Sequence, residues 1–115
     1  MVNKGNYYKN KTAKYFRDLG YTVETSEKYI RYLDKKTNSV KWYKKDIFGA
    51  DLIAINRDEI IFIQVKFGRK NIAQAIKEFA KYPFPPFVKL WVVVWEKGAR
   101  EPEIINYWEV VNEQS

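Results

Sequence analysis

The sequence predicts a mixed α/β domain in which a mixed β-sheet is flanked by helices, with elements in the order α-β-β-β-β-α-β-β. Two segments have the apolar periodicity of amphipathic helices. Residues 59–66 are apolar almost throughout, as expected of a central strand covered on both faces. A helical segment separates them from a second apolar run at residues 88–96, which indicates a helix crossover between strands. At 115 residues we expect one domain, spanning 1–115.

In the first half of the chain, a helix is predicted over residues 6–19. Gly20 is placed to end it, and the side chains expected on its buried face are Tyr8, Thr12, Tyr15, Phe16 and Leu19. Residues 21–25 follow as a short strand. Residues 28–45 predict a β-hairpin with its turn from Lys35 to Ser39.

The second half predicts the remaining sheet and a second helix. Residues 50–56 alternate in part and predict a strand, which turns into the strand at 59–66. A helix follows over residues 69–82, and its inward side chains are expected to be Ile72, Ile76, Phe79 and Ala80. The prolines of residues 83–86 stop this helix. Two strands complete the chain, a buried one at residues 88–96 and an edge strand at residues 103–111.

The sequence contains no Cys and no His. Their absence excludes disulfides, thiolate zinc sites, cysteine nucleophiles, Ser-His-Asp hydrolases and imidazole-ligated transition metals. Any metal is therefore expected to be a hard cation bound by oxygen. No segment resembles a signal peptide or approaches a membrane span, so we expect a cytoplasmic protein, or one in a host cytoplasm if the gene is viral.

The net charge of +7 lies in the first part of the chain. Residues 1–45 carry 12 Lys/Arg and 4 Asp/Glu, whereas residues 46–115 carry 9 and 10. A concentrated positive field suits a polyanion such as nucleic acid. The alternative is a solvated lysine-rich surface.

Three polar residues stand at the edges of the most apolar strands: Asp51, Gln64 and Lys66. Gln64 and Lys66 share one face of a strand. If residues 50–56 and 59–66 pair as an antiparallel hairpin, Asp51 lies beside them. A carboxylate and an amide oxygen can hold Mg²⁺ beside a phosphate, and an ammonium group can position the attacking water. The alternative is structural, with Asp51 capping a turn and the other two side chains reaching solvent.

The segments Gly49-Ala50-Asp51 and Gln64-Val65-Lys66 follow a basic helix and precede a helix and an apolar strand. Together they resemble the PD-(D/E)XK nuclease superfamily. Within it, the architecture is similar to that of small archaeal Holliday junction resolvases and of phage and viral nucleases with a Gln-x-Lys motif. The resemblance implies a restriction-endonuclease-like fold and a Mg²⁺- or Mn²⁺-dependent DNA endonuclease. Its implied substrate is branched or junction DNA, or DNA of any sequence.

The resemblance also implies roles for individual residues. Asp51 would bind the metal, with Gln64 as a second ligand and Val65 contributing its backbone carbonyl. Lys66 would be the catalytic lysine. Gln74 resembles a helix glutamine that many relatives place near the site.

Two departures from the family pattern bear on catalysis. Gln64 replaces the usual Glu, which lowers the expected affinity for a hard cation, and the first helix lacks the Glu of the resolvases. Asp46 or Glu78 could supply the missing acid. The alternatives are that Asp46 only begins a strand or turn and that Glu78 only pairs with Lys77 or Lys81. These departures leave open a DNA-binding module that has lost catalysis, or a structural protein with a vestigial site.

Basic residues on both helices and the hairpin are expected to follow a DNA backbone, unless they only solvate the surface. The candidate DNA-binding residues are Lys9, Lys11, Lys14, Lys44, Lys45, Arg69, Lys70, Gln74, Lys77 and Lys81.

The hairpin aromatics Tyr32, Trp42 and Tyr43 could stack on unpaired bases, but we expect them to form a sheet face with core contacts. No segment predicts a base-reading recognition helix. The similarity to resolvases and the apolar segment 83–95 also imply a homodimer.

Overall fold

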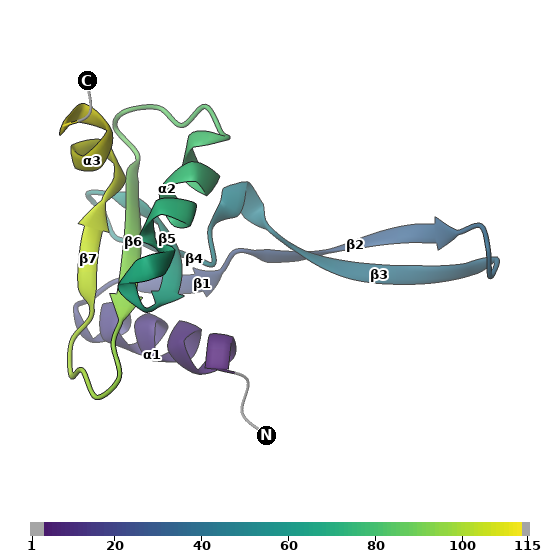
Figure 1. Cartoon of the computed structure of the whole chain (residues 1–115), viewed down its shortest axis with the longest axis horizontal. Helices are drawn as coiled ribbons and strands as arrows, with labels where there is room; N and C mark the ends of the chain where they lie inside the picture. The colour runs from purple at the N-terminus through teal and green to yellow at the C-terminus, as the bar shows by residue number, and fades with distance from the viewer. Residues whose placement is uncertain (1–3, 114–115) are drawn as a thin grey trace.

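The computed structural model of the protein describes residues 4–113; the side chains at positions 4, 5, 27–30, 43, 44 and 113 lie outside the description. The elements, in chain order, are α1 (Lys4–Asp18), β1 (Thr22–Thr25), β2 (Glu27–Asp34), β3 (Ser39–Asp46), the 3₁₀ turn η1 (Ile47–Gly49), β4 (Leu52–Ile55), β5 (Ile60–Phe67), the 3₁₀ turn η2 (Arg69–Asn71), α2 (Ile72–Ala80), β6 (Lys89–Trp95), β7 (Glu103–Asn106) and α3 (Tyr107–Glu113) (Figure 1).

The predicted fold class is confirmed, because a five-stranded mixed sheet is flanked by helices. Its strand order is β1-β4-β5-β6-β7. The pair β5–β6 is parallel and is connected through α2, whereas the other neighbours are antiparallel. The predicted element order has four strands between the first two helices. The structure has five between α1 and α2, because the hairpin contributes two.

Strand β5 has side chains buried on both of its faces. Ile61 and Ile63 are fully buried in a cluster with Phe16 of α1. On the opposite face, Phe62 packs in a second cluster that contains Phe79 of α2 and residues of α3. The central strand therefore presents alternate residues to two different helical layers, which explains its nearly continuous apolar sequence.

The first helix is anchored by a polar contact inside the aromatic core. Trp95 Nε1 donates a hydrogen bond to Thr12 Oγ1 at 2.8 Å. Thr12 Oγ1 in turn donates to the carbonyl of Tyr8 at 2.7 Å, so the buried hydroxyl has both an acceptor and a donor partner. This contact holds α1 against β6.

Two of the residues expected to be buried are exposed in the structure. Leu19 is 58% exposed because α1 ends at Asp18 and the following turn carries Leu19 outward. On α2, Ala75 rather than Ala80 is buried, because Ala75 and Phe79 lie one helical turn apart on the packed face.

The predicted edge strand at residues 103–111 is strand only over β7, and the rest is the helix α3. Asn106 Oδ1 accepts a hydrogen bond from the amide of Trp108 at 3.0 Å, which satisfies a free donor of the first helical turn. Tyr107, Trp108 and Val111 then pack on the α2 side of the sheet. Residues spaced three and four apart bury one helix face here, a pattern that strand alternation cannot produce.

The hairpin β2–β3 forms its own two-stranded sheet and projects away from the body (Figure 1). The expectation of core contacts for its aromatics is wrong for Tyr32 and Trp42, which are 44% and 61% exposed, while the side chain of Tyr43 lies outside the description. In the described part of the chain β2 and β3 pair only with each other, and the side chains of residues 31–42 are almost all exposed. The Cα radius of gyration, 15.8 Å, exceeds the ~13 Å of a compact domain of this length.

No helix among residues 4–113 combines the length and the apolar character that crossing a membrane requires.

Candidate functional site

The candidate site lies at the open end of the β4–β5 hairpin. The register pairs Leu52 with Ile63, and the ladder continues one residue beyond β4 because the amide of Asp51 donates to the carbonyl of Ile63 at 2.8 Å. The amide of Val65 donates to Asp51 Oδ2, also at 2.8 Å. The predicted hairpin is thus confirmed, and it brings Asp51 beside the strand that carries Gln64 and Lys66.

A polar cavity of about 380 Å³ opens at this point. Side chains from the hairpin root, the β4–β5 hairpin and α2 surround it. The lining residues are Lys45, Asp46, Gly49, Asp51, Gln64, Lys66, Gln74, Glu78 and Tyr82. The structure therefore brings together residues that are as far apart as 45 and 82 in the sequence.

Asp51 is a largely buried acid, with its side chain 14% exposed, that pairs with Lys9. Burial raises its pKa to about 6, although the hydrogen bond from Val65 and the charge of Lys9 act in the opposite direction. Asp46 raises the pKa further, through its charge and a side-chain hydrogen bond. Lys9 Nζ lies 3.6 Å from Asp51 Oδ1. The residue of α1 that reaches this carboxylate is therefore a lysine.

Gln64 is only 2% exposed and links the sheet to α2. Its Nε2 donates to the backbone carbonyl of Ala75 at 3.1 Å. Because that carbonyl can only accept, the amide NH₂ must face α2, and Oε1 is the atom left to accept a bond or bind a cation. A glutamate at this position would place an acceptor against an acceptor.

The two alternative acids, Asp46 and Glu78, both line the cavity. Asp46 interacts directly with the carboxyl of Asp51. Glu78 Oε1 accepts a hydrogen bond from Lys81 Nζ at 2.9 Å, which is the surface pairing considered for it. Of these two acids, Asp46 is therefore the one placed to act together with Asp51.

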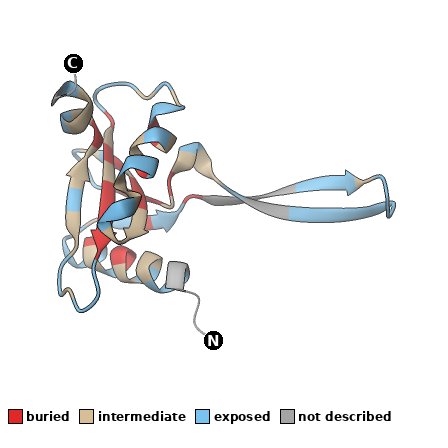
Figure 2. Ribbon diagram, viewed as in Figure 1, coloured by how far each residue is buried: buried red, intermediate tan, exposed pale blue. Residues whose placement is uncertain are grey.

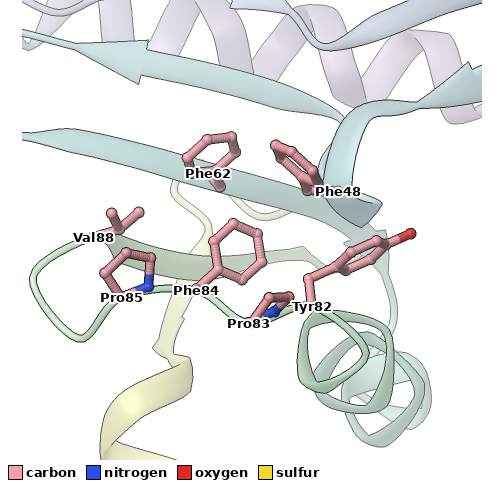
Figure 3. A pocket seen from close by; sticks show the side chains of 7 residues that line it. All are labelled: Phe48, Phe62, Tyr82, Pro83, Phe84, Pro85 and Val88. Atoms are coloured by element: carbon pink, nitrogen blue, oxygen red, sulfur yellow. The ribbon is translucent and has the colours of Figure 1, made fainter.

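The segment between β3 and β4 has a backbone conformation that the sequence does not predict. Phe48 and Gly49 both have positive φ, +52° and +74°. The ring of Phe48 is 51% exposed and packs edge-on against Phe62, Tyr82 and Phe84, with centroid distances of 5.7 to 6.3 Å. Figure 3 shows this cluster around an apolar pocket of about 310 Å³. Tyr82 lines both this pocket and the polar cavity.

Ser26 is a further positioning residue that sequence analysis missed. It is 1% exposed, its hydroxyl donates to the carbonyl of Ala50, and its amide donates to the carbonyl of Asp51 at 3.1 Å. Its own carbonyl accepts from the amide of Ile47 at 3.1 Å. Ser26 therefore fixes both ends of the segment that carries Asp46 and Asp51. A serine between two strands has no distinctive sequence signal.

The candidate DNA-binding residues are placed differently from one another. Lys45 and Gln74 line the cavity, and Lys9 contacts Asp51. Lys11 lies 4.5 Å from the Trp95 ring and donates to the carbonyl of Ala99. Arg69 pairs with Glu103, Lys81 pairs with Glu78, and the exposed remainder are Lys14, Lys70 and Lys77. The side chain of Lys44 lies outside the described residues.

The oxygen atoms of the cavity suit a hard divalent cation. Two adjacent carboxylates, Asp46 and Asp51, and the amide oxygen of Gln64 are donors of the kind that Mg²⁺ and Mn²⁺ take. Among the side chains that the structure describes, which exclude Glu27 and Glu113, no cluster of three or more Asp or Glu is arranged to hold a metal ion. The residues fit a cation held by two protein carboxylates together with neutral oxygens.

The mixed sheet and its flanking helices form a restriction-endonuclease-like fold. Among solved structures, the chain is similar to Hjc of Archaeoglobus fulgidus, a Holliday junction resolvase from an archaeal hyperthermophile. The TM-score is 0.57 at 15% identity, and the match covers 92% of this chain and 75% of that one. A protein of unknown function, AF1548, matches with a TM-score of 0.49 and 15% identity over 93% of this chain and 53% of that one. No family model matches the sequence. No curated protein matches it either.

Replacing Asp51 by Asn should stabilise the protein at neutral pH. The folded-state pKa of about 6 lies above the ordinary 3.8, so the unfolding free energy of the wild type falls as pH rises from 4 to 6. The introduced amide keeps an acceptor for Val65 without the buried charge. Urea unfolding of Asp51→Asn should show a gain of at most about 3 kcal/mol above pH 7 that vanishes near pH 4. An equal gain at both pH values would contradict a raised pKa.

Replacing Gly49 by Ala should destabilise the protein more than replacing Gly98. Both glycines have positive φ, but an added Cβ at Gly49 would lie 3.3 Å from Tyr82 Cε2, whereas Gly98 has open space around it. Gly98→Ala should lose about 1 kcal/mol through its backbone conformation alone. Gly49→Ala should lose about 1 kcal/mol more in urea unfolding. Equal losses of unfolding free energy in the two variants would show that the Tyr82 ring moves aside without a measurable cost.

Proposed function

We propose that this protein is a metal-dependent DNA endonuclease that hydrolyses phosphodiester bonds, selective for branched or junction DNA or cutting without sequence preference. The observation that carries the proposal is the cavity in which a largely buried acid, Asp51, meets Asp46, Gln64 and Lys66. The restriction-endonuclease-like fold supports it, and the similar Hjc is described as a Holliday junction resolvase.

In this proposal, Asp51 and Asp46 hold Mg²⁺ or Mn²⁺ together with Gln64 Oε1 and the carbonyl of Val65. When bound, the cation supplies a Lewis acid that promotes attack of water on the phosphate. Asp51 must be ionised to bind it, and its raised pKa means that the apo site releases this proton near neutral pH. Asp51 is positioned before substrate arrives, because the Val65 amide binds its carboxylate and the Ser26 amide binds its backbone carbonyl.

Two lysines of the cavity would act on the phosphate. Lys66 follows Gln64 by two residues on β5, so both side chains lie on the α2 face of the sheet. Its ammonium group can orient the attacking water or offset charge in the transition state. Lys45 also lines the cavity, at the root of the β2–β3 hairpin. The exposed Lys70 and Lys77 and the cavity-lining Gln74 would continue the track for the DNA backbone along α2.

A second candidate function is a DNA-binding module that has lost catalysis. The observation that favours it is Lys9, whose Nζ lies 3.6 Å from Asp51 and partly neutralises the acid without a cation. The hydrogen bond of Gln64 to Ala75 likewise gives this amide a structural role. Such a module would bind DNA without metal and weaken steeply with salt.

Purified protein should cut supercoiled, single-stranded or four-way-junction DNA when Mg²⁺ or Mn²⁺ is present. Asp51→Ala and Lys66→Ala should each slow cleavage at least about 100-fold, because each removes a charge from the reacting centre. Asp58→Ala and Lys97→Ala, which change exposed groups outside the cavity, are the matched controls. If no substrate is cut, or if the first two variants cut like the wild type, the nuclease proposal fails.

Gln64→Glu separates the two candidate functions. Without a cation, the new carboxylate faces the Ala75 carbonyl, so the variant should lose about 1–3 kcal/mol in thermal or urea unfolding. If the site binds a cation, millimolar Mn²⁺ should restore that stability and lower the metal concentration needed for cleavage. No response to Mn²⁺ would favour the binding module. If Glu78 is instead the second acid, Glu78→Ala should severely reduce DNA cleavage, whereas Gln64→Glu should change the metal dependence of cleavage little.

A further inference from the structure

The β2–β3 hairpin carries an exposed apolar face that the body of the protein does not cover. Leu33, Val40 and Trp42 are 57%, 52% and 61% exposed. Figure 2 shows the described outer part of the hairpin as largely exposed. An isolated two-stranded hairpin is at best marginally stable in water, and a contiguous exposed apolar surface marks an interaction site.

The strand register places the apolar side chains on one face. Leu33 pairs with Val40, and Arg31 pairs with Trp42. Directly opposed residues share a face, as do residues two apart. Leu33, Val40, Trp42 and Arg31 therefore form one surface, which we name the apolar face. Tyr32 and its partner Lys41 lie on the other side of the ribbon.

The charge of the hairpin and its position indicate what covers this face. Residues 27–46 carry seven Lys/Arg and three Asp/Glu, a balance of +4. This charge favours a polyanion and opposes the approach of the same ribbon from a second copy. Strand β3 ends at Asp46, which lines the candidate site together with Lys45. Trp42, three residues before Lys45, is about 10 Å from the cavity rim along the strand.

We propose that the apolar face covers the base pair exposed at a DNA branch point, while Lys35 and Lys36 at the hairpin turn contact the phosphates of the adjoining arm. This inference rests on the proposed function and names the residues that select its substrate. A base pair inside a linear duplex has both faces stacked on its neighbours, whereas a branch point whose arms are not stacked on each other leaves a flat aromatic face open. Stacking on such a face is tolerant of sequence, which agrees with the lack of a base-reading element.

The test compares Trp42→Ser with Tyr32→Ser, a matched change on the other face of the same ribbon. Fluorescence anisotropy in metal-free buffer measures the Kd for a four-way junction, for a linear duplex of the same arms and for single-stranded DNA. Trp42→Ser should reduce the junction preference, the Kd ratio of duplex to junction, about tenfold. Tyr32→Ser should leave this ratio within about twofold, because its face does not meet the base pair.

A truncated chain gives a second measurement. Replacing residues 31–42 by Asn-Gly joins Ile30 to Tyr43, which are directly opposed, through a two-residue hairpin turn. The five-stranded sheet does not include these residues, so the thermal unfolding midpoint should stay close to that of the wild type. The truncated protein should bind junction and duplex with nearly equal affinity.

The outcomes separate this inference from the proposed function. If the wild type neither binds nor cuts any DNA, both fail. If it cuts and prefers junctions while Trp42→Ser and the truncation keep that preference, only the inference is overturned. Equal competition by single-stranded DNA would overturn it in favour of unpaired bases. A change from dimer to monomer in Trp42→Ser, measured by light scattering, would overturn it in favour of a second copy.

Discussion

The register of the β4–β5 hairpin determines where every group of the candidate site lies. Two hydrogen bonds tie Asp51 to β5 past the end of β4: its amide donates to the carbonyl of Ile63, and its carboxylate accepts from the amide of Val65. Because strand side chains alternate, a slip of one residue would send Gln64 and Lys66 to the α1 side of the sheet. The apolar residues of β5, buried against two different layers, oppose such a slip. Core packing and site geometry therefore depend on the same pairing.

The chemistry of the site follows from how this pairing buries a carboxylate. Desolvation raises the pKa of Asp51, and Asp46 beside it adds to the effect. Two neighbouring carboxylates, one of them largely desolvated, are unfavourable in the apo protein, and a divalent cation would relieve this. Lys9 supplies a partial substitute from α1. Gln64 is in a different position, because its NH₂ group is committed to the backbone of α2 while its oxygen remains able to bind a cation. The amide thus fits a structural and a metal-binding role together.

The segment between the β2–β3 hairpin and β4 connects the hairpin, which carries the apolar face, with the candidate site. It runs from the root of β3 through η1, where Phe48 and Gly49 take left-handed conformations. Such conformations persist only when surrounding contacts determine them. Here the aromatic cluster on one side and Ser26 on the other provide those contacts. This segment therefore connects the root of the β2–β3 hairpin to the cavity through defined contacts.

Much of this protein follows from its sequence alone. The helix and strand periods predicted the mixed sheet, and the two apolar strands joined by a short turn predicted that Asp51 meets Gln64 and Lys66. Local patterns determine these features, since pairing across a tight turn leaves little freedom. The sequence did not predict that residues 107–113 form a helix or that the β2–β3 hairpin stands apart from the core, and it did not reveal the roles of Ser26 and Lys9. Only the tertiary structure decided these features. They depend on which surfaces remain available after the sheet has formed and on contacts between residues distant in the chain.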